Sequence, residues 1–268
     1  MSKVWFITGA SRGFGEAFAR AALERGDRVA GTARRVEDLE GLRAFGDAFL
    51  PLHLDVTDRA ADIAAVQQAH AHFGALDVVV NNAGYGHFGF FEEITEEEAR
   101  AQMETNLFGA MWVTQAAVPI MRAQGRGHIV QISSIGGVGA FPSLGIYHAS
   151  KWALEGMSEA LAQEVAGQGI KVTLVEPGSY GTDWSGSSAT RSTPNPLYDG
   201  FRQAMAQRAG QMTYGDAKQA AQALLKVVDS ENPPLRILFG AQAFDIAQGV
   251  YASRVQTWKA WEDVSRNA

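Results

Sequence analysis

Cysteine is absent from the 268-residue chain. Its absence excludes disulfides, iron–sulfur clusters, thiolate zinc sites and cysteine nucleophiles. Long apolar runs are also missing, because no stretch approaches the roughly 20 residues that a membrane-spanning helix needs. The first eight residues contain neither the apolar run nor the small-residue cleavage site of a signal peptide. We therefore expect a soluble, cytoplasmic protein that does not enter a membrane.

An excess of positive charge is the third thing that the chain lacks. Its 23 Lys and Arg residues are outnumbered by 29 Asp and Glu residues, so the formal net charge is −6. Proteins that bind nucleic acid carry basic patches that neutralise phosphates. The charge balance thus argues against nucleic acid as a partner. The six histidines form no H-E-x-x-H pattern, which argues against a catalytic metal.

What the chain does contain is an alternation of short apolar runs with longer helical patterns, up to about residue 240. The predicted strands are Val4–Thr8, Arg28–Ala33, Ala48–Leu54, Leu76–Asn81, Gly127–Ser133, Lys171–Val175 and Leu235–Phe239. The predicted helices lie near Gly13–Arg25, Arg59–Phe73, Glu96–Ala123, Tyr147–Gly167 and Gly215–Val228. This alternation predicts an α/β fold, in which a doubly wound parallel sheet of about seven strands is covered on both faces.

We interpret residues 1–268 as one domain with two additions. A polar stretch rich in turn-forming residues, Gly186–Pro196, interrupts the alternation. It is either a mobile substrate lid, for which we assign residues 183–212, or a plain surface insertion. The tail, 241–268, carries Tyr251, Trp258 and Trp261 partly on one helical face, and it covers either the domain's own core or a neighbouring subunit.

A glycine-rich turn follows the first predicted strand directly and opens the first helix. Its sequence is Thr8-Gly9-Ala10-Ser11-Arg12-Gly13-Phe14-Gly15, with the spacing G-x-x-x-G-x-G. Unpaired N–H groups and the helix dipole make such a helix start an anion site. Glycines alone could mark a merely tight turn, but their place after the first strand favours a dinucleotide site.

The end of the second strand indicates which dinucleotide fits. An acidic residue there would bind the ribose hydroxyls of NAD. This chain has Ala33-Arg34-Arg35 instead, and Arg12 lies within the turn. Guanidinium groups near the ribose favour a 2′-phosphate, so we predict NADP, with NADPH preferred over NADH. We assign this role to Arg12 and Arg34 and expect Arg35 to face solvent.

Tyr147 and Lys151 lie four residues apart at the start of a predicted helix. Residues at this spacing share a helix face, so the phenol and the ammonium can approach one cavity. A nearby ammonium favours phenolate and should lower the tyrosine pKa from its usual value near 10. Ser133 and Ser134 follow the preceding strand, at the sheet edge where α/β proteins bind ligands.

At this point the chain resembles a short-chain dehydrogenase/reductase of the single-domain type that prefers NADP. The matching motifs run in the family's order from Lys3 to about Thr182. They are Thr8-Gly9-x-x-x-Gly13-x-Gly15, Asp55-Val56, Asn81-Asn82-Ala83-Gly84, Asn106, Ser134, Tyr147-x-x-x-Lys151 and Pro177-Gly178. The resemblance implies a Rossmann-type fold and an oxidoreductase activity.

The resemblance also implies residue roles. Tyr147 is expected to act as general acid in reduction and base in oxidation, while Ser134 stabilises charge on the substrate oxygen. Lys151 is expected to hold the nicotinamide ribose, and Asn106 to complete a proton relay. The cofactor-binding residues implied are Gly9, Ser11, Arg12, Gly13, Phe14, Gly15, Arg34, Asp55, Val56, Asn82, Ala83, Gly84, Tyr147, Lys151, Pro177, Gly178 and Thr182. Asn81 is expected to brace neighbouring elements, and Ser133 to be structural.

We expect hydride transfer between nicotinamide and a hydrophobic or aromatic carbonyl compound or secondary alcohol. The substrate-site candidates are Ser134, Tyr147, Phe88, Phe90, Phe141, Leu144, Tyr180 and Trp184. The apolar ones serve equally well as core or interface residues. Tyr180 departs from the family's smaller aliphatic residue, so it either reshapes the pocket or points outward.

Two other functions stay open, an epimerase or dehydratase and a non-catalytic NADP sensor. Epimerases and dehydratases usually space their glycines differently and carry a longer substrate domain. A sensor would have lost Ser134, Tyr147 or Lys151, and all three are present. The two long helices near Glu96–Ala123 and Tyr147–Gly167 pair subunits in this family, so we expect a homodimer or homotetramer.

Overall fold

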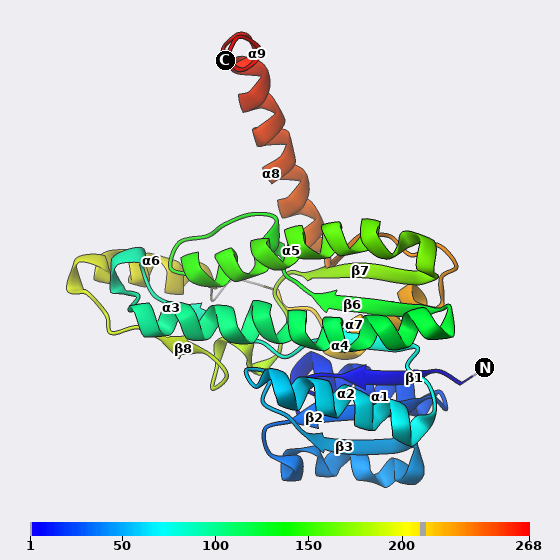
Figure 1. Ribbon diagram of the computed structural model, residues 1–268. Helices are drawn as coiled ribbons and strands as arrows, with labels where there is room; N and C mark the ends of the chain where they lie inside the picture. Colours follow the sequence, from blue (N-terminus) through cyan, green and yellow to red (C-terminus); the bar gives the residue numbers. More distant parts are fainter. Residues whose placement is uncertain (1, 210–212) are drawn as a thin grey trace.

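The computed structural model describes residues 2–209 and 213–268, and it places the predicted apolar runs side by side in a parallel sheet. The seven strands of this sheet follow the order β3-β2-β1-β4-β6-β7-β9 (Figure 1). Their bounds are β1 (Val4–Ile7), β2 (Arg28–Ala33), β3 (Phe49–His53), β4 (Val78–Asn81), β6 (Gly127–Ile132), β7 (Ile170–Pro177) and β9 (Arg236–Phe239). The seven predicted strands are confirmed, with ends that shift by no more than two residues.

Helices cover both faces of the sheet, as the alternation predicts. One face carries α1 (Gly13–Glu24), α7 (Ala217–Asp229) and the 3₁₀ segment η1 (Val36–Ala48), and the other carries α2 (Arg59–Phe73), α4 (Gly109–Gln124) and α5 (Gly145–Val165). Strand β1 shows why both faces are apolar. Trp5 and Ile7 join the core under α1 and α7, whereas Val4 and Phe6 join the core under α2 and α4. The fold is Rossmann-type.

The predicted helix Glu96–Ala123 is interrupted by a π-helical turn. Thr95 caps its first part, α3 (Glu96–Met103), through the reciprocal hydrogen bonds with Glu98 that define a capping box. The π turn, η3 (Glu104–Phe108), follows and then continues into α4. π turns inside α-helices are frequent at functional sites, and this one contains Asn106.

The predicted lid contains regular structure as far as it is described. Strand β8 (Thr190–Arg191) pairs in parallel with β5 (His87–Phe88), which follows β4. The other lid elements are η6 (Asp183–Ser185), η7 (Pro196–Tyr198) and α6 (Asp199–Ala209). The last part of the predicted lid, residues 210–212, lies outside the described residues. The small β5–β8 sheet ties the lid to the segment that contains Gly84.

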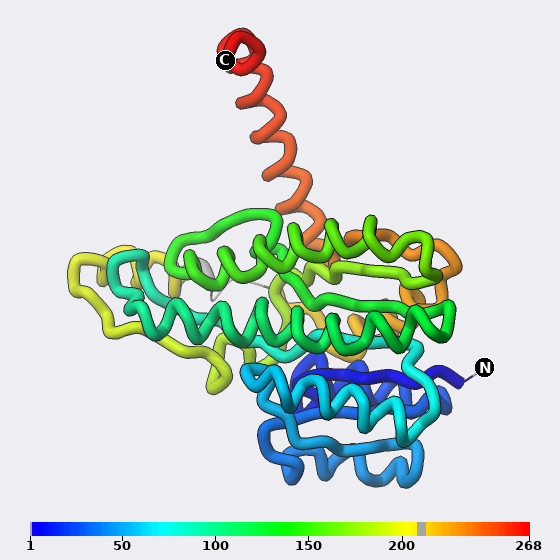
Figure 2. The backbone as a smooth tube through the Cα atoms, viewed as in Figure 1, coloured from blue at the N-terminus to red at the C-terminus, as the bar shows by residue number. Residues whose placement is uncertain are grey.

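The tail forms α8 (Ala241–Ala260) and the short α9 (Glu262–Arg266). Only the first part of α8 packs on the body, and the rest stands clear of it (Figure 2). A helix long and apolar enough to cross a membrane is not found in residues 2–209 and 213–268. The three remaining one-turn segments are η2 (Phe91–Glu93), η4 (Ile135–Gly137) and η5 (Ala166–Gln168).

Candidate active site

The glycine turn joins β1 to α1 in a conformation that requires its glycines. Gly9 and Gly13 have positive φ angles of 65° and 59°, which L side chains rarely adopt. A Cβ on Gly15 would lie 2.1 Å from the Gly9 carbonyl oxygen. The side-chain amide of Asn82 donates to the carbonyl oxygens of Thr8 (2.9 Å) and Gly9 (3.0 Å). The turn is therefore held from the β4 side, and the start of α1 has no side-chain cap among the described residues.

Three arginines meet at a cavity of about 660 Å³ beside this turn. The cavity is lined by Ser11, Arg12, Arg34, Arg35 and Asp38. Arg35 forms an exposed ion pair with Asp38 (2.7 Å), and Arg12 lies 3.2 Å from Asp183 of the lid. Among the described residues, Arg34 has no carboxylate partner within salt-bridge distance. Its charge is available to a ligand in the cavity.

Tyr147 and Lys151 lie in the first two turns of α5, with both side chains buried. The Lys151 ammonium is 5.8 Å from the centre of the Tyr147 ring and donates to the Ile132 carbonyl oxygen at 2.7 Å. Ser134 follows β6, and its Oγ accepts a hydrogen bond from the Gly136 amide. The serine, the tyrosine and the lysine thus meet at the carboxyl end of β6.

Burial sets the protonation of this group. It raises the pKa of Tyr147 to about 12, and the Ser134 hydroxyl opposes that rise. It also lowers the pKa of Lys151 to about 8, which the Glu155 carboxylate opposes. The predicted lowering of the Tyr147 pKa is therefore wrong for this structure, because desolvation raises the pKa and outweighs the opposing Ser134 hydrogen bond. The phenol is protonated at neutral pH, as a proton donor must be.

Asn106 lies beside the same group because the π turn directs it there. Its side-chain amide donates to the Tyr85 carbonyl oxygen (3.0 Å) and to Ser150 Oγ (3.1 Å). A Cβ on Gly84 would lie 3.1 Å from Asn106 Oδ1 and 3.8 Å from Lys151 Nζ. The segment after β4 thus passes directly over both side chains, and only glycine leaves that space open.

The lid closes over Tyr147 with an aromatic side chain. The ring centre of Trp184 lies 5.0 Å from that of Tyr147 and 5.3 Å from that of Phe88. A Cβ on Gly86 would lie 2.5 Å from the Trp184 ring, so the missing side chain at Gly86 makes room for the tryptophan. Trp184 and Phe88 were predicted substrate-site residues, and the structure brings Trp184 to the catalytic tyrosine candidate and Phe88 to Trp184.

Other predicted substrate-site residues lie around this centre or away from it. Phe141 packs its ring against His148, which follows Tyr147. Tyr180 instead packs against Phe14, with ring centres 4.8 Å apart, and fills the space above Gly215. Phe90 stacks on Tyr198 of the lid, and Leu144 forms a β-bridge with Gly89.

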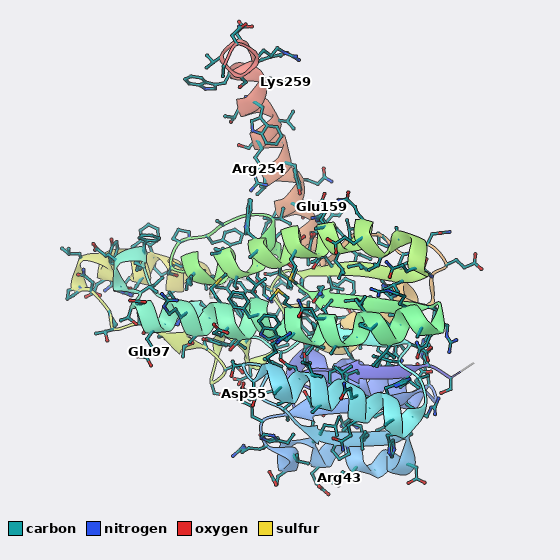
Figure 3. All side chains as sticks on the ribbon, in the orientation of Figure 1. Arg43, Asp55, Glu97, Glu159, Arg254 and Lys259 are labelled. Atoms are coloured by element: carbon teal, nitrogen blue, oxygen red, sulfur yellow. The ribbon has the colours of Figure 1, made fainter. Side chains whose placement is uncertain are left out.

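The remaining predicted cofactor residues occupy the carboxyl edge of the sheet. Asp55, labelled in Figure 3, follows β3 and accepts hydrogen bonds from the amide and hydroxyl of Thr57. Val56 packs against Gly109 at the start of α4. The Ala83 amide donates to Thr8 Oγ1 at 2.9 Å. These contacts hold Asp55, Val56 and Ala83 at the same sheet edge as the glycine turn.

The end of β7 lies at the same edge of the sheet. Pro177 is the last residue of β7, and the Gly178 amide donates to the Phe239 carbonyl oxygen at 3.0 Å. A Cβ on Gly178 would lie 3.3 Å from Ala243 Cβ, so this glycine allows the base of α8 to pack closely. A Cβ on Gly13 would lie 3.7 Å from Thr182 Cβ, which places the start of the lid beside the glycine turn.

Sequence reasoning missed a buried group behind Lys151. Arg236 of β9 donates to Glu155 at 2.9 Å and lies 3.7 Å from Glu176. Burial raises the pKa of Glu176 to about 7 and also raises that of Glu155. The available signal was the spacing of Glu155, four residues after Lys151 on α5. Asn81 makes the bracing contacts expected of it, donating to Thr114 and Gln131.

The chain matches the family profile described as short chain dehydrogenase over residues 3–192. The chain belongs to the short-chain dehydrogenase family. Oxidoreductase BOA17 of Botryotinia fuckeliana is 42% identical, with 99% of this chain and 98% of that protein covered. The crystal structure of a short-chain dehydrogenase from Streptomyces avermitilis has a TM-score of 0.93 at 43% identity, with 99% and 98% of the two chains covered.

Two more distant short-chain dehydrogenases were solved with a nicotinamide cofactor. The protein from Burkholderia cenocepacia contains NADP and has a TM-score of 0.77 at 28% identity, with 97% of both chains covered. The protein from Burkholderia phymatum contains NAD and has a TM-score of 0.80 at 25% identity, with 98% of this chain and 95% of that chain covered. The family thus uses both dinucleotides, and this chain is an oxidoreductase of that family.

Proposed function

We propose that the protein is an NADP(H)-dependent carbonyl reductase or alcohol dehydrogenase that acts on hydrophobic or aromatic substrates. The observation that carries the proposal is the meeting of Tyr147, Lys151, Ser134 and Asn106 beneath Trp184, beside the glycine turn. The residues fit a nicotinamide dinucleotide, because the start of α1 has no side-chain cap among the described residues and the cavity beside the turn is lined by three arginines that suit phosphate. When bound, the cofactor supplies or accepts a hydride.

The chain's own residues would control the proton. Tyr147 holds it on the phenol oxygen and passes it to the carbonyl oxygen during reduction, and it takes the proton back during oxidation. Ser134 would donate a hydrogen bond to the same substrate oxygen and stabilise its developing charge. Lys151 would hold the ribose and, while protonated, lower the cost of forming the phenolate. Asn106 would orient the groups through which the proton is replaced.

The arginine cavity supports NADP. Arg34 has no carboxylate within salt-bridge distance among the described residues, and Arg12 lines the same cavity. A 2′-phosphate placed there would meet two guanidinium groups, which bind phosphate in a bidentate manner. The ribose hydroxyls of NAD would gain little from these cations. We assign the preference for NADPH to Arg12 and Arg34.

The aromatic wall supports an apolar substrate. Trp184, Phe88 and Tyr147 present ring surfaces around the position where a carbonyl would meet the phenol. Aromatic surface of this kind stabilises a ligand mainly through buried apolar area. Of the polar groups near the phenol, Ser134 is assigned to the reacting oxygen, whereas Lys151 and Asn106 are assigned to the ribose and to the proton relay. The remainder of the substrate would therefore be recognised by shape and apolar contact.

An activity screen tests the proposal. Purified protein is incubated with NADPH or NADH and a panel of aliphatic and aromatic ketones and aldehydes, and cofactor oxidation is followed by absorbance. We expect faster turnover with NADPH and with the apolar carbonyls. Tyr147→Phe should lower kcat by roughly 10²–10⁴-fold, the usual contribution of general acid–base catalysis. The exposed Tyr214→Phe is the matched control. A Tyr147→Phe protein as active as the parent would overturn the mechanism.

A second pair of variants tests the cofactor assignment. Arg34→Ala should raise the KM for NADPH at least tenfold and leave the KM for NADH nearly unchanged. Arg43→Ala is the control, since Arg43 lies on η1 and pairs with Glu40 (Figure 3). Equal or better use of NADH by the parent protein would refute the preference for NADP. If NADPH is preferred and Arg34→Ala retains that preference, the assignment of Arg34 fails.

A further inference from the structure

The C-terminal arm, residues 241–268, is anchored only at its base. Ala243 and Ala247 are buried against Ile135 and Val138, which follow β6. Arg254 closes this contact by donating to the Val138 carbonyl oxygen at 2.7 Å and by stacking over the Trp152 ring. Beyond Arg254 every residue to the C-terminus is exposed. Figure 3 shows the arm leaving the body near Arg254 and extending past Lys259.

The free part of the arm carries an apolar stripe. Tyr251, Val255 and Trp258 follow the i, i+4, i+7 spacing of one helix face, and their side chains are 50%, 41% and 63% exposed. Trp261, at the end of α8, is 61% exposed. A helical segment of this length without tertiary contacts is marginally stable in water. The stripe therefore offers an apolar contact surface to another molecule.

A second exposed apolar surface lies at the lid. We define the lid rim as Phe91, Leu197 and Phe201, whose side chains are 91%, 85% and 49% exposed. The rim is firmly supported, because Phe90 beneath it stacks on Tyr198 with ring centres 4.2 Å apart and contacts Phe201 edge-on. Within one chain the arm stands clear of the body and does not reach α6 (Figures 1 and 2).

Charge argues for a protein surface rather than a lipid surface as the occupant. The arm carries three acidic and three basic side chains, Asp245, Glu262, Asp263, Arg254, Lys259 and Arg266. Helices that lie on anionic membranes are rich in Lys and Arg and gain affinity from each of those charges. A balanced arm gains nothing of that kind. The lid rim, by contrast, offers apolar surface on the same chain, so two copies contain both halves of a contact.

We propose that two copies of the chain exchange arms, and that the stripe of each arm packs on the lid rim of the other. The two rings of the stripe, Tyr251 and Trp258, and the neighbouring Trp261 are each half exposed or more and present on the order of 350 Å² per arm. Two arms and the surfaces that receive them would bury about 1,400 Å², the size of a standard stable interface. The contact is the same in both directions, as a closed two-fold dimer requires.

This arrangement makes the partner part of the substrate entrance. The lid rim combines η2, which lies outside the lid, with η7 and α6, which belong to the same lid as Trp184. An arm seated on the rim would cover this lid from outside and restrict its opening. The exchange would thus link the assembly state to the substrate site. The inference does not depend on which carbonyl compound the enzyme reduces.

Sedimentation and cross-linking test the exchange. The parent protein should sediment as a dimer, or as an even multiple of it, and Trp258→Ser/Trp261→Ser should halve the mass. Tyr214→Ser is the control, because it changes an exposed aromatic residue outside both surfaces. Because the chain lacks cysteine, a Trp261→Cys chain can be mixed with a Leu197→Cys chain and oxidised with diamide. A disulfide-linked heterodimer should form.

Each contrary outcome overturns the proposal. If the parent protein sediments as a monomer at micromolar concentration, the arm has no second copy of the chain to contact. A dimer without the Trp261→Cys to Leu197→Cys link refutes the lid rim as the receiving surface. A link formed within a single chain carrying both substitutions shows that the arm folds back on its own body. Sedimentation of the parent with anionic phosphatidylserine vesicles would show a lipid surface instead. None of these results depends on catalytic activity.

Discussion

Replacing Trp184 with alanine should change the acid–base behaviour of Tyr147. The structure attributes the raised pKa of Tyr147, about 12, to burial, and Trp184 is the lid side chain stacked nearest its ring. A rise of about 2 units from the ordinary value near 10 corresponds to about 2.7 kcal/mol against the phenolate. Trp184 is one of several groups that bury the phenol. Its removal should therefore reverse roughly half of the rise in the Tyr147 pKa, or about one unit.

The pH profile of alcohol oxidation measures the shift, since oxidation needs the phenolate. With saturating NADP, kcat/KM should rise with pH, and the Trp184→Ala profile should move about one unit toward lower pH than the parent. Trp184→Phe retains a ring and should keep the parental profile. Phe88→Ala removes a ring that contacts Trp184 and serves as a second control. An unchanged profile in Trp184→Ala would show that lid burial does not set the Tyr147 pKa.

Three further predictions concern stability. Asp62 is fully buried and its pKa is raised to about 8, so ionising it lowers the stability of the fold as pH rises from about 4 to 8. Asp62→Asn should therefore raise the free energy of unfolding by up to about 4 kcal/mol at pH 7 and leave it unchanged near pH 3. Urea unfolding at the two pH values measures the difference. Gly15→Ala should cost about 1–3 kcal/mol and lower Tm, because its Cβ meets the Gly9 carbonyl, whereas Gly156→Ala, with open space around it, should not. Burial lowers the pKa of His128 to about 4, so the stability that the neutral ring contributes above pH 6.5 should be lost as pH falls toward 4. In His128→Gln the free energy of unfolding should therefore depend less on pH in that range.

The sequence predicts the sheet well because its strands are buried on both faces. A strand such as β4 must be apolar at every position, and that demand is visible in the run Val78–Val80. The glycine turn is equally visible, because its backbone angles and close contacts favour glycine over every other residue at Gly9 and Gly15. These features are local, or they repeat along one element.

Features that depend on distant partners were not predictable. Strand β8 has two exposed residues and exists because it pairs with β5, about 100 positions earlier. The contact between Arg12 and Asp183 joins residues 171 positions apart. The pKa of Tyr147 was expected to fall because Lys151 is near in sequence, but it rises because Trp184, far along the chain, helps to bury it. The spacing of residues in the sequence predicts which side chains are neighbours on one helix. It does not predict whether those side chains are buried from solvent.

The π turn at Glu104–Phe108 determines which faces of α3 and α4 point toward the rest of the protein, although the two helices are continuous. The extra residue in that turn rotates everything after it by about 100° relative to a regular helix. The polar side of α3 can therefore face the segment after β4, where Gln102 donates to the Tyr85 carbonyl oxygen and accepts from the His87 amide, while α4 keeps an apolar side on the sheet. Deleting one residue there would bring the two halves back into phase and turn either the Gln102 contacts or the sheet contacts toward solvent.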